Sequence, residues 1–249
     1  MSKPMVIVIP MAGRGSRFAD AGWTVPKPLI EFRGKMMIEH VLDAFPASPD
    51  SRFVLIVRDD FLRDYPECMD RLRNRGNVEF APAKKVTQGA ACSVLLARRF
   101  FRNASLLAAD SDTFYKPGVL KRFFEEIERC DPDLGLMTFR STRPCYSYAK
   151  LAGGGTFGRL EQIAEKQVIS EHAVSGVYYF KSAGAFEDAA VEAMIYGDKD
   201  RGEFYLSGVF GAAAKQSAAS VLLHEIDPGE MFCTGTPEQL KEAEERLSE

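Results

Sequence analysis

The feature that most constrains this chain is a short apolar run near its start that leads directly into a glycine-containing loop. Residues 6–9 read VIVI, which is typical of a strand buried on both faces of a parallel sheet. The loop after this run carries two glycines, a serine and two cations: Gly13, Gly15, Ser16, Arg17 and Lys27. In α/β sheets, ligands bind at the carboxyl ends of the strands. The sequence therefore predicts an α/β fold with a ligand-binding loop after its first strand.

Apolar and amphipathic segments alternate through the first half of the chain. Apolar runs predict strands at 5–9, 53–57 and 104–109, and amphipathic runs predict helices at 37–45, 60–75, 90–101 and 118–130. This alternation is typical of parallel strands joined by right-handed crossovers.

After residue 133 the pattern changes to strands joined by tight turns, followed by helices. Strands are expected at 134–140, 147–152, 158–165, 174–180 and 220–226, and helices at 183–196, at 203–216 and from Pro237. The three glycines at 153–155 predict a hairpin tip. Because there is no linker or repeat, we expect a single Rossmann-like α/β domain over residues 1–249. Its mixed, mostly parallel sheet would be flanked by helices and carry extra antiparallel strands in the C-terminal half.

Charge and composition argue against several classes of protein. With 32 basic and 35 acidic side chains and a net charge of -3, the chain shows no preference for nucleic acid. No stretch approaches the ~18 apolar residues of a membrane span, and the apolar run at the N-terminus is too short for a signal peptide. The five cysteines are odd in number, widely spaced and in no metal-ligand pattern. We therefore expect a cytoplasmic protein with reduced thiols.

The loop after the first strand has the chemistry of a phosphate site. Gly13 and Gly15 let backbone N–H groups approach phosphate oxygens, and Arg17 and Lys27 supply fixed positive charge. The loop is not a P-loop, because no Gly-Lys-Ser/Thr follows, and it lacks the third glycine of a dinucleotide fingerprint. Two glycines alone are also consistent with an ordinary tight turn. The two added cations favour phosphate recognition.

Together with this loop, several later segments resemble one enzyme family. PMAGRGSRF and VPKPLI resemble the signature loop of nucleotidylyltransferases that activate sugar phosphates, the pyrophosphorylase family. Weaker matches follow in order: QGAA at 88–91, LLAADSDTF at 106–114, EK at 165–166, SGVYYF at 175–180 and GTPEQL at 235–240. The combination resembles small bacterial capsule and surface-polymer enzymes, a group that includes CTP:phosphoglutamine cytidylyltransferase.

The resemblance implies transfer of a nucleotidyl group from an NTP to a phosphorylated acceptor, with release of pyrophosphate, for surface polysaccharide precursors. CTP is favoured ahead of UTP, and the acceptor would be a sugar phosphate, a polyol phosphate or a phospho-amino acid. The acceptor phosphate is itself the nucleophile, so no protein nucleophile is needed. We expect Arg17 on the β- and γ-phosphates and Lys27 between the α-phosphate and the acceptor phosphate. The cradle around the triphosphate would be Met11, Ala12, Gly13, Arg14, Gly15 and Ser16.

The family's metal is expected at the end of the third predicted strand. Mg²⁺ prefers carboxylate and phosphate oxygens, and the resemblance assigns Asp112 as its ligand, with Asp110 on the nucleotide side. The two aspartates are also consistent with a strand-terminal turn. Related enzymes often carry Asp where this chain has Cys233, and a thiol is a poor Mg²⁺ ligand. Either one carboxylate suffices, or Asp227 or Glu230 substitutes, or the substrate supplies the oxygen.

The remaining matches imply how the two substrates are divided along the chain. The nucleotide half, about residues 1–132, would contact the base and ribose through Gln88, Gly89 and Ala90, although Gln88 also suits the start of a helix. The acceptor half, about residues 133–249, would use Glu165, Lys166, Ser175, Gly176 and Glu203. Successive strand residues point to opposite faces, so Glu165 and Lys166 cannot both face the site unless the strand ends or bulges there.

Two other functions fit parts of the sequence. Asp110-x-Asp112 at a strand end is used by metal-dependent glycosyltransferases that consume nucleotide sugars, but the glycine loop with its cations suits a triphosphate. A module that only senses nucleotides is disfavoured by the intact Arg17, Lys27 and Asp112 and slightly favoured by Cys233. No nucleic-acid or membrane partner is expected, and a homo-oligomer is compatible with the charge-rich C-terminal helix.

Overall fold

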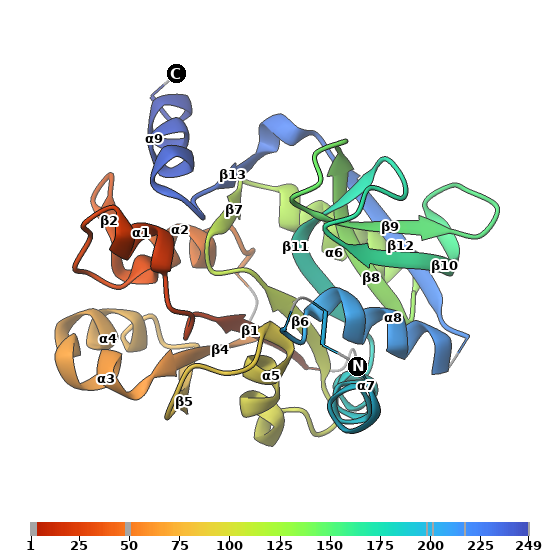
Figure 1. Cartoon of the computed structure of the whole chain (residues 1–249), viewed down its shortest axis with the longest axis horizontal. Coiled ribbons are helices and arrows are strands. Elements are labelled where there is room, and N and C mark those ends of the chain that lie inside the picture. Colours follow the sequence, from red (N-terminus) through yellow and green to blue (C-terminus); the bar gives the residue numbers. More distant parts are fainter. Residues whose placement is uncertain (1–3, 48–50, 198, 201, 217, 249) are drawn as a thin grey trace.

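One mixed sheet organises the chain (Figure 1). The computed structural model describes residues 4–47, 51–197, 199–200, 202–216 and 218–248. In this part of the chain the sheet contains β1 (Met5–Pro10), β4 (Ser51–Arg58), β5 (Val78–Ala83), β6 (Ser105–Ala109), β8 (Leu134–Arg140), β9 (Ser147–Leu151), β10 (Phe157–Glu165), β11 (His172–Phe180) and β12 (Ser220–Ile226). Their order across the sheet is β5-β4-β1-β6-β11-β8-β12-β10-β9.

The half of the sheet built by the first part of the chain is parallel. In β1, Ile7 lies opposite Phe53 of β4 on one side and Leu107 of β6 on the other, and β4 continues parallel to β5. The helices between these strands are α2 (Met37–Asp43), α3 (Asp59–Asp64), α4 (Pro66–Arg73) and α5 (Ala90–Val94), followed by the 3-10 helix η2 (Leu95–Phe100). The predicted alternation is confirmed. It places the carboxyl ends of β1 and β6 at the same edge of the sheet.

The other half of the sheet is mainly antiparallel, as expected for the C-terminal part. β11 runs antiparallel to β6 and β8, β10 runs antiparallel to β12 and β9, and β8 and β12 are parallel. The helices of this half are α6 (Val119–Cys130), α7 (Ala183–Tyr196) and α8 (Leu206–Gln216). The turn between β9 and β10 holds the three glycines of the predicted hairpin tip.

Alternate residues of the strands pack into two hydrophobic cores, one on each face of the sheet. Ile7 and Ile9 belong to the core that α2, α4 and α6 complete, and Val6 and Val8 belong to the core beneath α5, α7 and α8. Successive side chains of a strand point to opposite faces, so a run such as VIVI is fully buried only between two layers of helices. Polar residues that could form a site therefore lie mainly in the loops at the edge of the sheet.

Two short strand pairs lie beside the main sheet. β2 (Glu31–Phe32) pairs with β3 (Lys35–Met36), and β7 (Thr113–Tyr115) pairs antiparallel with β13 (Met231–Cys233). The remaining elements are α1 (Ser16–Asp20), the 3-10 helices η1 (Lys27–Leu29) and η3 (Pro228–Glu230), and α9 (Pro237–Arg246). The β7–β13 pair brings the C-terminal segment back to the end of β6 (Figure 1).

The single helix expected at 60–75 is wrong, because the chain forms α3 and α4 instead. Tyr65 leaves the helical conformation, with φ of -130° and ψ of 52°, and Pro66 starts the second helix. Proline has no N–H to donate and is favoured at a first helical position, so it ends one helix and begins another.

Two further helix boundaries and one strand differ from the sequence-based expectation. The helix expected at 90–101 is α-helical only to Val94 and continues as η2, and the helix expected from residue 203 begins at Leu206. No strand was predicted at β5, which contains Pro82, a residue that is unusual within a strand. β5 tolerates this proline because it is the edge strand of the sheet.

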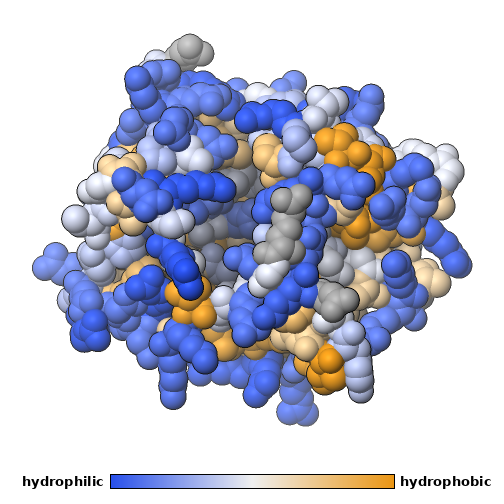
Figure 2. Space-filling view, in the orientation of Figure 1, coloured by the Kyte–Doolittle hydropathy of each residue, from blue (hydrophilic) through white to orange (hydrophobic). Residues whose placement is uncertain are grey.

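The face of the molecule shown in Figure 2 is mostly hydrophilic, with a hollow near its centre and a few separate hydrophobic areas. In the described part of the chain, no helix combines the length and the apolar character that crossing a membrane requires.

Candidate active site

The glycine loop follows β1 at the carboxyl edge of the sheet. Met11 still belongs to the sheet, since its side chain is buried and its N–H donates to the Ile56 carbonyl over 3.0 Å. Gly15 has a φ of +61°, and a Cβ there would lie 3.3 Å from the Cβ of Lys27. Gly15 therefore lets the loop fold back against Lys27, while Gly13 faces open space.

Lys27 and Asp112 meet at this edge. Their ammonium and carboxylate groups form an ion pair, and both side chains are largely buried. Lys27 is the first residue of η1, where Pro26 and Pro28 restrict the backbone. Burial would raise the pKa of the Asp112 carboxyl, but the Lys27 ammonium outweighs burial and lowers that pKa below its ordinary value, with a smaller contribution from Arg17. The three residues predicted to act on phosphates and metal therefore lie within electrostatic reach of one another.

The segment after β13 fixes the backbone of Asp112. The Thr234 N–H and hydroxyl both donate to the Asp112 carbonyl, over 2.7 and 2.9 Å. A Cβ at Gly235 would lie 3.2 Å from an Asp112 carboxylate oxygen, so a side chain there would crowd it. Thr234 directly precedes the motif GTPEQL and Gly235 begins it, and the role of these two residues in positioning Asp112 is seen only in the fold.

Asp110 lies against β11, beside the Lys27–Asp112 pair. Its N–H donates to the Gly176 carbonyl over 3.0 Å, and its carboxylate occupies the space that a side chain at position 176 would need. Gly176 has a φ of +92° and lies where the register of β11 against β8 shifts. Burial raises the pKa of Asp110 to about 8, and the Asp112 charge adds to this rise. The fold thus holds two carboxyl groups where added positive charge would stabilise both in ionised form.

Cys233 lies near these aspartates and is a neutral thiol at neutral pH. Burial, followed by the nearby carboxylate charge, raises its pKa to about 11. The two carboxylates considered as substitutes are occupied elsewhere: Asp227 accepts from the Gly229 N–H over 2.6 Å, and Glu230 pairs with an α6 arginine over 2.7 Å. Both carboxylates therefore have partners other than the residues around Asp112. Among the described residues, no group of three or more His, Cys, Asp or Glu side chains is arranged to hold a metal.

A cavity of about 720 Å³ separates the glycine loop from the loop before α5. Most of the predicted nucleotide residues line it: Ala12, Gly13, Arg14, Gly15, Ser16, Gln88, Gly89 and Ala90. Pro10, Val86, Thr87, Ser93, Gly202 and Glu203 are further lining residues. Met11 and Asp110 do not line this nucleotide cavity, because Met11 is in the core and Asp110 packs on β11. Arg17 is exposed on α1.

Gly89 brings a distant segment against this cavity. Its φ is +127°, and a Cβ there would overlap the backbone of Phe204. The Phe204 N–H donates to the Gln88 carbonyl over 2.8 Å, and the Ala91 N–H donates to the Phe204 carbonyl over 3.2 Å. Residues 202–205, which we name the crossing loop, are thereby fastened to the start of α5.

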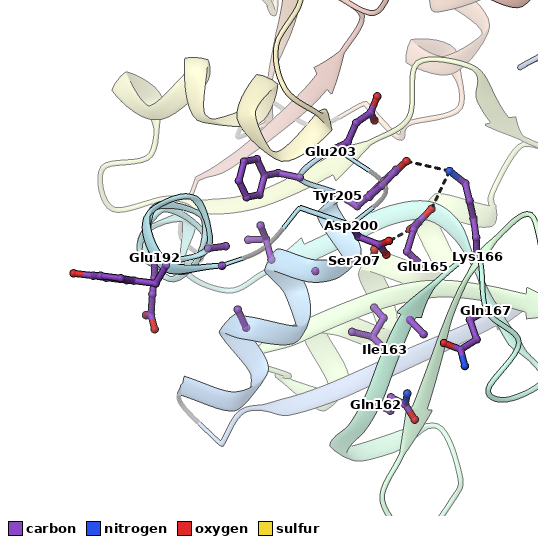
Figure 3. Close-up of a pocket in the computed structure, with 18 residues that line it drawn as sticks. Gln162, Ile163, Glu165, Lys166, Gln167, Glu192, Asp200, Glu203, Tyr205 and Ser207 are labelled. Carbon is purple, nitrogen blue, oxygen red and sulfur yellow. Dashed lines mark hydrogen bonds and ion pairs between the residues drawn. The ribbon is translucent and has the colours of Figure 1, made fainter.

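A second cavity, of about 860 Å³, opens beside β10, α7 and α8 (Figure 3). Glu165 is the last residue of β10, and Lys166 has a φ of +53°, so the chain turns and both side chains line this cavity. Lys166 Nζ donates to the Tyr205 hydroxyl over 3.1 Å and lies 3.7 Å from a Glu165 carboxylate oxygen. The end of the strand is what allows two successive residues to face one site.

Glu165 is held by serines that the sequence did not point to. Its side chain is only 10% exposed, and its carboxylate accepts hydrogen bonds from the hydroxyls of Ser147 and Ser207. These serines come from β9 and α8, 18 and 42 residues away in the sequence. No local pattern could have revealed them, because only the fold brings the three elements together.

Ser175 and Gly176 lie away from this second cavity. Ser175 is buried: its hydroxyl donates to the Met137 carbonyl over 3.1 Å, and the Tyr115 hydroxyl donates to the Ser175 carbonyl over 2.8 Å. The two residues shape β11 around Asp110. Of the predicted acceptor residues, the structure brings Glu165, Lys166 and Glu203 to the cavity.

Comparison with known proteins identifies the family to which the chain belongs. The model of MobA-like NTP transferase domains matches residues 7–178, more than half of the chain. The chain belongs to this family. The protein is therefore a nucleotidyltransferase. The matched region contains Arg17, Lys27, Asp112 and Lys166, and it ends before the crossing loop. No curated protein matches the chain.

Solved structures share the fold of this NTP transferase. A nucleoside-diphosphate-sugar pyrophosphorylase from Vibrio cholerae RC9 is 26% identical, with a TM-score of 0.78, over 96% of this chain and 99% of that one. The inositol-1-phosphate CTP transferase from T. maritima is 17% identical, with a TM-score of 0.74, over 100% of this chain and 98% of its own. At 17% identity, the second likeness shows the fold alone.

Proposed function

We propose that this enzyme transfers a nucleotidyl group from CTP, or from UTP as second choice, to a phosphorylated small molecule and releases pyrophosphate. The observation that carries the proposal is the meeting of two cavities, one lined by the glycine loop and one by Lys166, at a shared residue, Glu203. A triphosphate suits the first cavity and a phosphate monoester suits the second. The sequence resemblance supports a role in making surface polysaccharide precursors in the cytoplasm.

In this reaction, an oxygen of the acceptor phosphate forms a bond to the α-phosphorus. The bond from the α-phosphorus to the oxygen that bridges to the β-phosphate breaks, and pyrophosphate leaves with its electron pair. The nucleophile is already an anion, so the enzyme has to place the two phosphates in line and offset their charge.

The site residues have separate roles in this proposal. Arg17 binds the β- and γ-phosphates that leave, and the backbone N–H groups of the glycine loop cradle the triphosphate. Lys27, already held at the edge of the sheet, lies between the α-phosphate and the acceptor phosphate. Lys166, oriented by Glu165 and the Tyr205 hydroxyl, binds the acceptor phosphate from the other side.

Asp110 and Asp112 fit a divalent cation. Two carboxyl groups lie at the end of one strand, and the raised pKa of Asp110 shows that burial and its neighbour disfavour a second negative charge there. Mg²⁺ prefers oxygen ligands of this kind, and these two residues would hold it. When bound, the ion offsets the negative charge of the phosphates. The neutral Cys233 thiol leaves the rest of its shell to substrate oxygens and water.

The division of the chain follows from the same proposal. Residues up to about 132 hold most of the nucleotide and the later residues hold the acceptor, with the crossing loop bordering both cavities, within one domain built on the continuous sheet. A sugar phosphate, a polyol phosphate or a phospho-amino acid fits a cavity that offers one ammonium, several carboxylates and three hydroxyls.

A direct test is to incubate the protein with Mg²⁺, each of the four NTPs and a panel of phosphate monoesters, and to measure pyrophosphate. We expect release with CTP and, more slowly, with UTP, and only when an acceptor is present. Release with no combination would contradict nucleotidyl transfer. Consumption of a nucleotide sugar without pyrophosphate would instead support a glycosyltransferase acting through Asp110 and Asp112.

A further inference from the structure

Glu203 is a charged side chain that the proposed roles leave without a partner. It lines both the nucleotide cavity and the acceptor cavity and is exposed to both. Its carboxylate makes no hydrogen bond or ion pair with any residue that the structure describes. In Figure 3 the side chain points away from the group formed by Glu165, Lys166 and Tyr205. It is therefore available to a ligand.

The backbone that carries Glu203 is held on both sides. The Glu203 N–H donates to the Asp200 carbonyl over 2.9 Å. The next residue, Phe204, exchanges backbone hydrogen bonds with Gln88 and Ala91 over 2.8 and 3.2 Å. The crossing loop thus places this carboxylate at a defined position between the cavities, which is what a specificity residue requires.

The position of Glu203 identifies the part of the nucleotide that it meets. In the proposed reaction, on which this step rests, the acceptor phosphate reaches the α-phosphorus, so the α-phosphate lies where the two cavities join. The ribose is attached directly to that phosphate, whereas the base lies one unit further away. A residue that lines both cavities therefore faces the ribose rather than the base.

The chemistry of the group agrees with this placement. An ionised carboxylate only accepts hydrogen bonds, and phosphate oxygens repel it. The ribose carries two adjacent hydroxyls, each a donor, that match the two oxygens of one carboxylate. In dinucleotide-binding α/β sheets, an acidic residue binds the ribose in this way. We infer that Glu203 accepts hydrogen bonds from the 2′- and 3′-hydroxyls of the bound NTP and so selects ribonucleotides over 2′-deoxyribonucleotides.

The test compares affinities for matched nucleotide pairs. The full chain with Mg²⁺ and no acceptor is titrated calorimetrically with CTP and dCTP, UTP and dUTP, ATP and dATP, and GTP and dGTP. For the NTP that binds best, we expect the ribonucleotide to bind about 10- to 100-fold more tightly than its deoxy form, because a hydrogen bond to a charged group is lost. Glu203→Ala reduces this ratio to within about threefold of unity, and Glu203→Gln gives an intermediate ratio.

The matched control is Asp200→Asn, which removes a carboxylate that lies just before the crossing loop and lines only the acceptor cavity. It should keep the ratio of ribonucleotide to deoxyribonucleotide affinity. An unchanged ratio in Glu203→Ala, or equal binding of both forms by the unmodified protein, overturns the inference, as does failure of every ribonucleotide to bind. Because binding is measured without an acceptor, a ratio that depends on Glu203 supports the inference even if the pyrophosphate assay rejects the proposed function.

Discussion

The Lys27 ammonium and the Asp112 carboxylate are paired across the carboxyl edge of the sheet, although 85 residues separate them in the sequence. The pair joins η1 to the strand end that the C-terminal segment also fastens through Thr234. Each charge is thus offset before any substrate arrives, and both groups are held where the proposed reaction needs them. Loss of either partner leaves the other charge at this edge without its counter-charge, so stability has to be measured beside activity.

Replacing Lys27 with alanine should abolish most turnover and leave the fold intact. Loss of a group that offsets developing charge raises the barrier by about 2–4 kcal/mol, which lowers kcat about 30- to 1,000-fold. Circular dichroism and the pyrophosphate assay check the two halves of this expectation. Lys35→Ala is the control, because Lys35 pairs with Asp43 over 2.6 Å at an exposed site. Full activity of Lys27→Ala would remove the role given to this residue.

Replacing Gly89 with alanine should weaken the binding of both substrates at once. A Cβ at this position would overlap the backbone of Phe204, so the crossing loop has to move. The φ of +127° adds backbone strain for any residue other than glycine. We expect KM for the NTP and for the acceptor each to rise about tenfold or more, since one loop borders both cavities. Steady-state kinetics with each substrate varied measures this.

The control for Gly89 is Gly154→Ala, at the β9–β10 turn. Its φ is +77° and nothing lies within 4 Å of a Cβ there, so only backbone strain is added. Stability in urea should fall by about 1 kcal/mol, and both KM values should stay unchanged. If Gly89→Ala changed the KM for only one of the two substrates, this would contradict the shared role of the crossing loop.

Mg²⁺ alone should stabilise the protein through the two aspartates. At ten times its dissociation constant, a ligand adds about 1.4 kcal/mol to the free energy of unfolding, which corresponds to a rise of about 3–5 °C in Tm for a chain of this size. Asp112→Asn should lose this rise, whereas Asp227→Asn should keep it, because Asp227 caps η3. Differential scanning fluorimetry with and without EDTA distinguishes these results. An equal Mg²⁺ effect in Asp112→Asn would place the ion elsewhere.

Cys233 should react slowly with thiol reagents at pH 8. With a pKa of about 11, about one molecule in a thousand carries the reactive thiolate at that pH. Since the raised pKa means that the proton leaves only at high pH, each unit of pH up to 10 should speed the reaction about tenfold. Peptide mass spectrometry after alkylation should therefore find the exposed Cys145 modified well before Cys233 at pH 8. Equal rates would show that the thiol is not shielded.

Elements that a local sequence pattern indicates could be predicted from the sequence. β1 and the glycine loop are examples, because VIVI is buried on both faces and Gly15 has the positive φ that glycine permits. Two prolines lie where the prediction was wrong or incomplete: Pro82 is inside an edge strand that was not predicted, and Pro66 begins the second of two helices that were expected to be one.

The part of the site that depends on long-range packing could not be predicted. Ser147 and Ser207 act on Glu165 only because β9, β10 and α8 lie together. Lys166 lines the same cavity as Glu165 because its backbone is in the left-handed conformation. This conformation is uncommon for residues other than glycine, and no sequence pattern predicts it here. Long-range contacts of this kind leave no period or spacing in the chain.

The crossing loop has a consequence for protein engineering. Residues 202–205 come from the half of the chain expected to choose the acceptor, yet Phe204 is hydrogen-bonded to the start of α5 and Glu203 lines the nucleotide cavity. Under the proposed function, we therefore expect specificity for the two substrates not to be modular in this enzyme. A chimera that imports the C-terminal half of a relative to change its acceptor would also import a new sugar-edge contact for the nucleotide, and it would need residues 88–91 from the same donor to seat it.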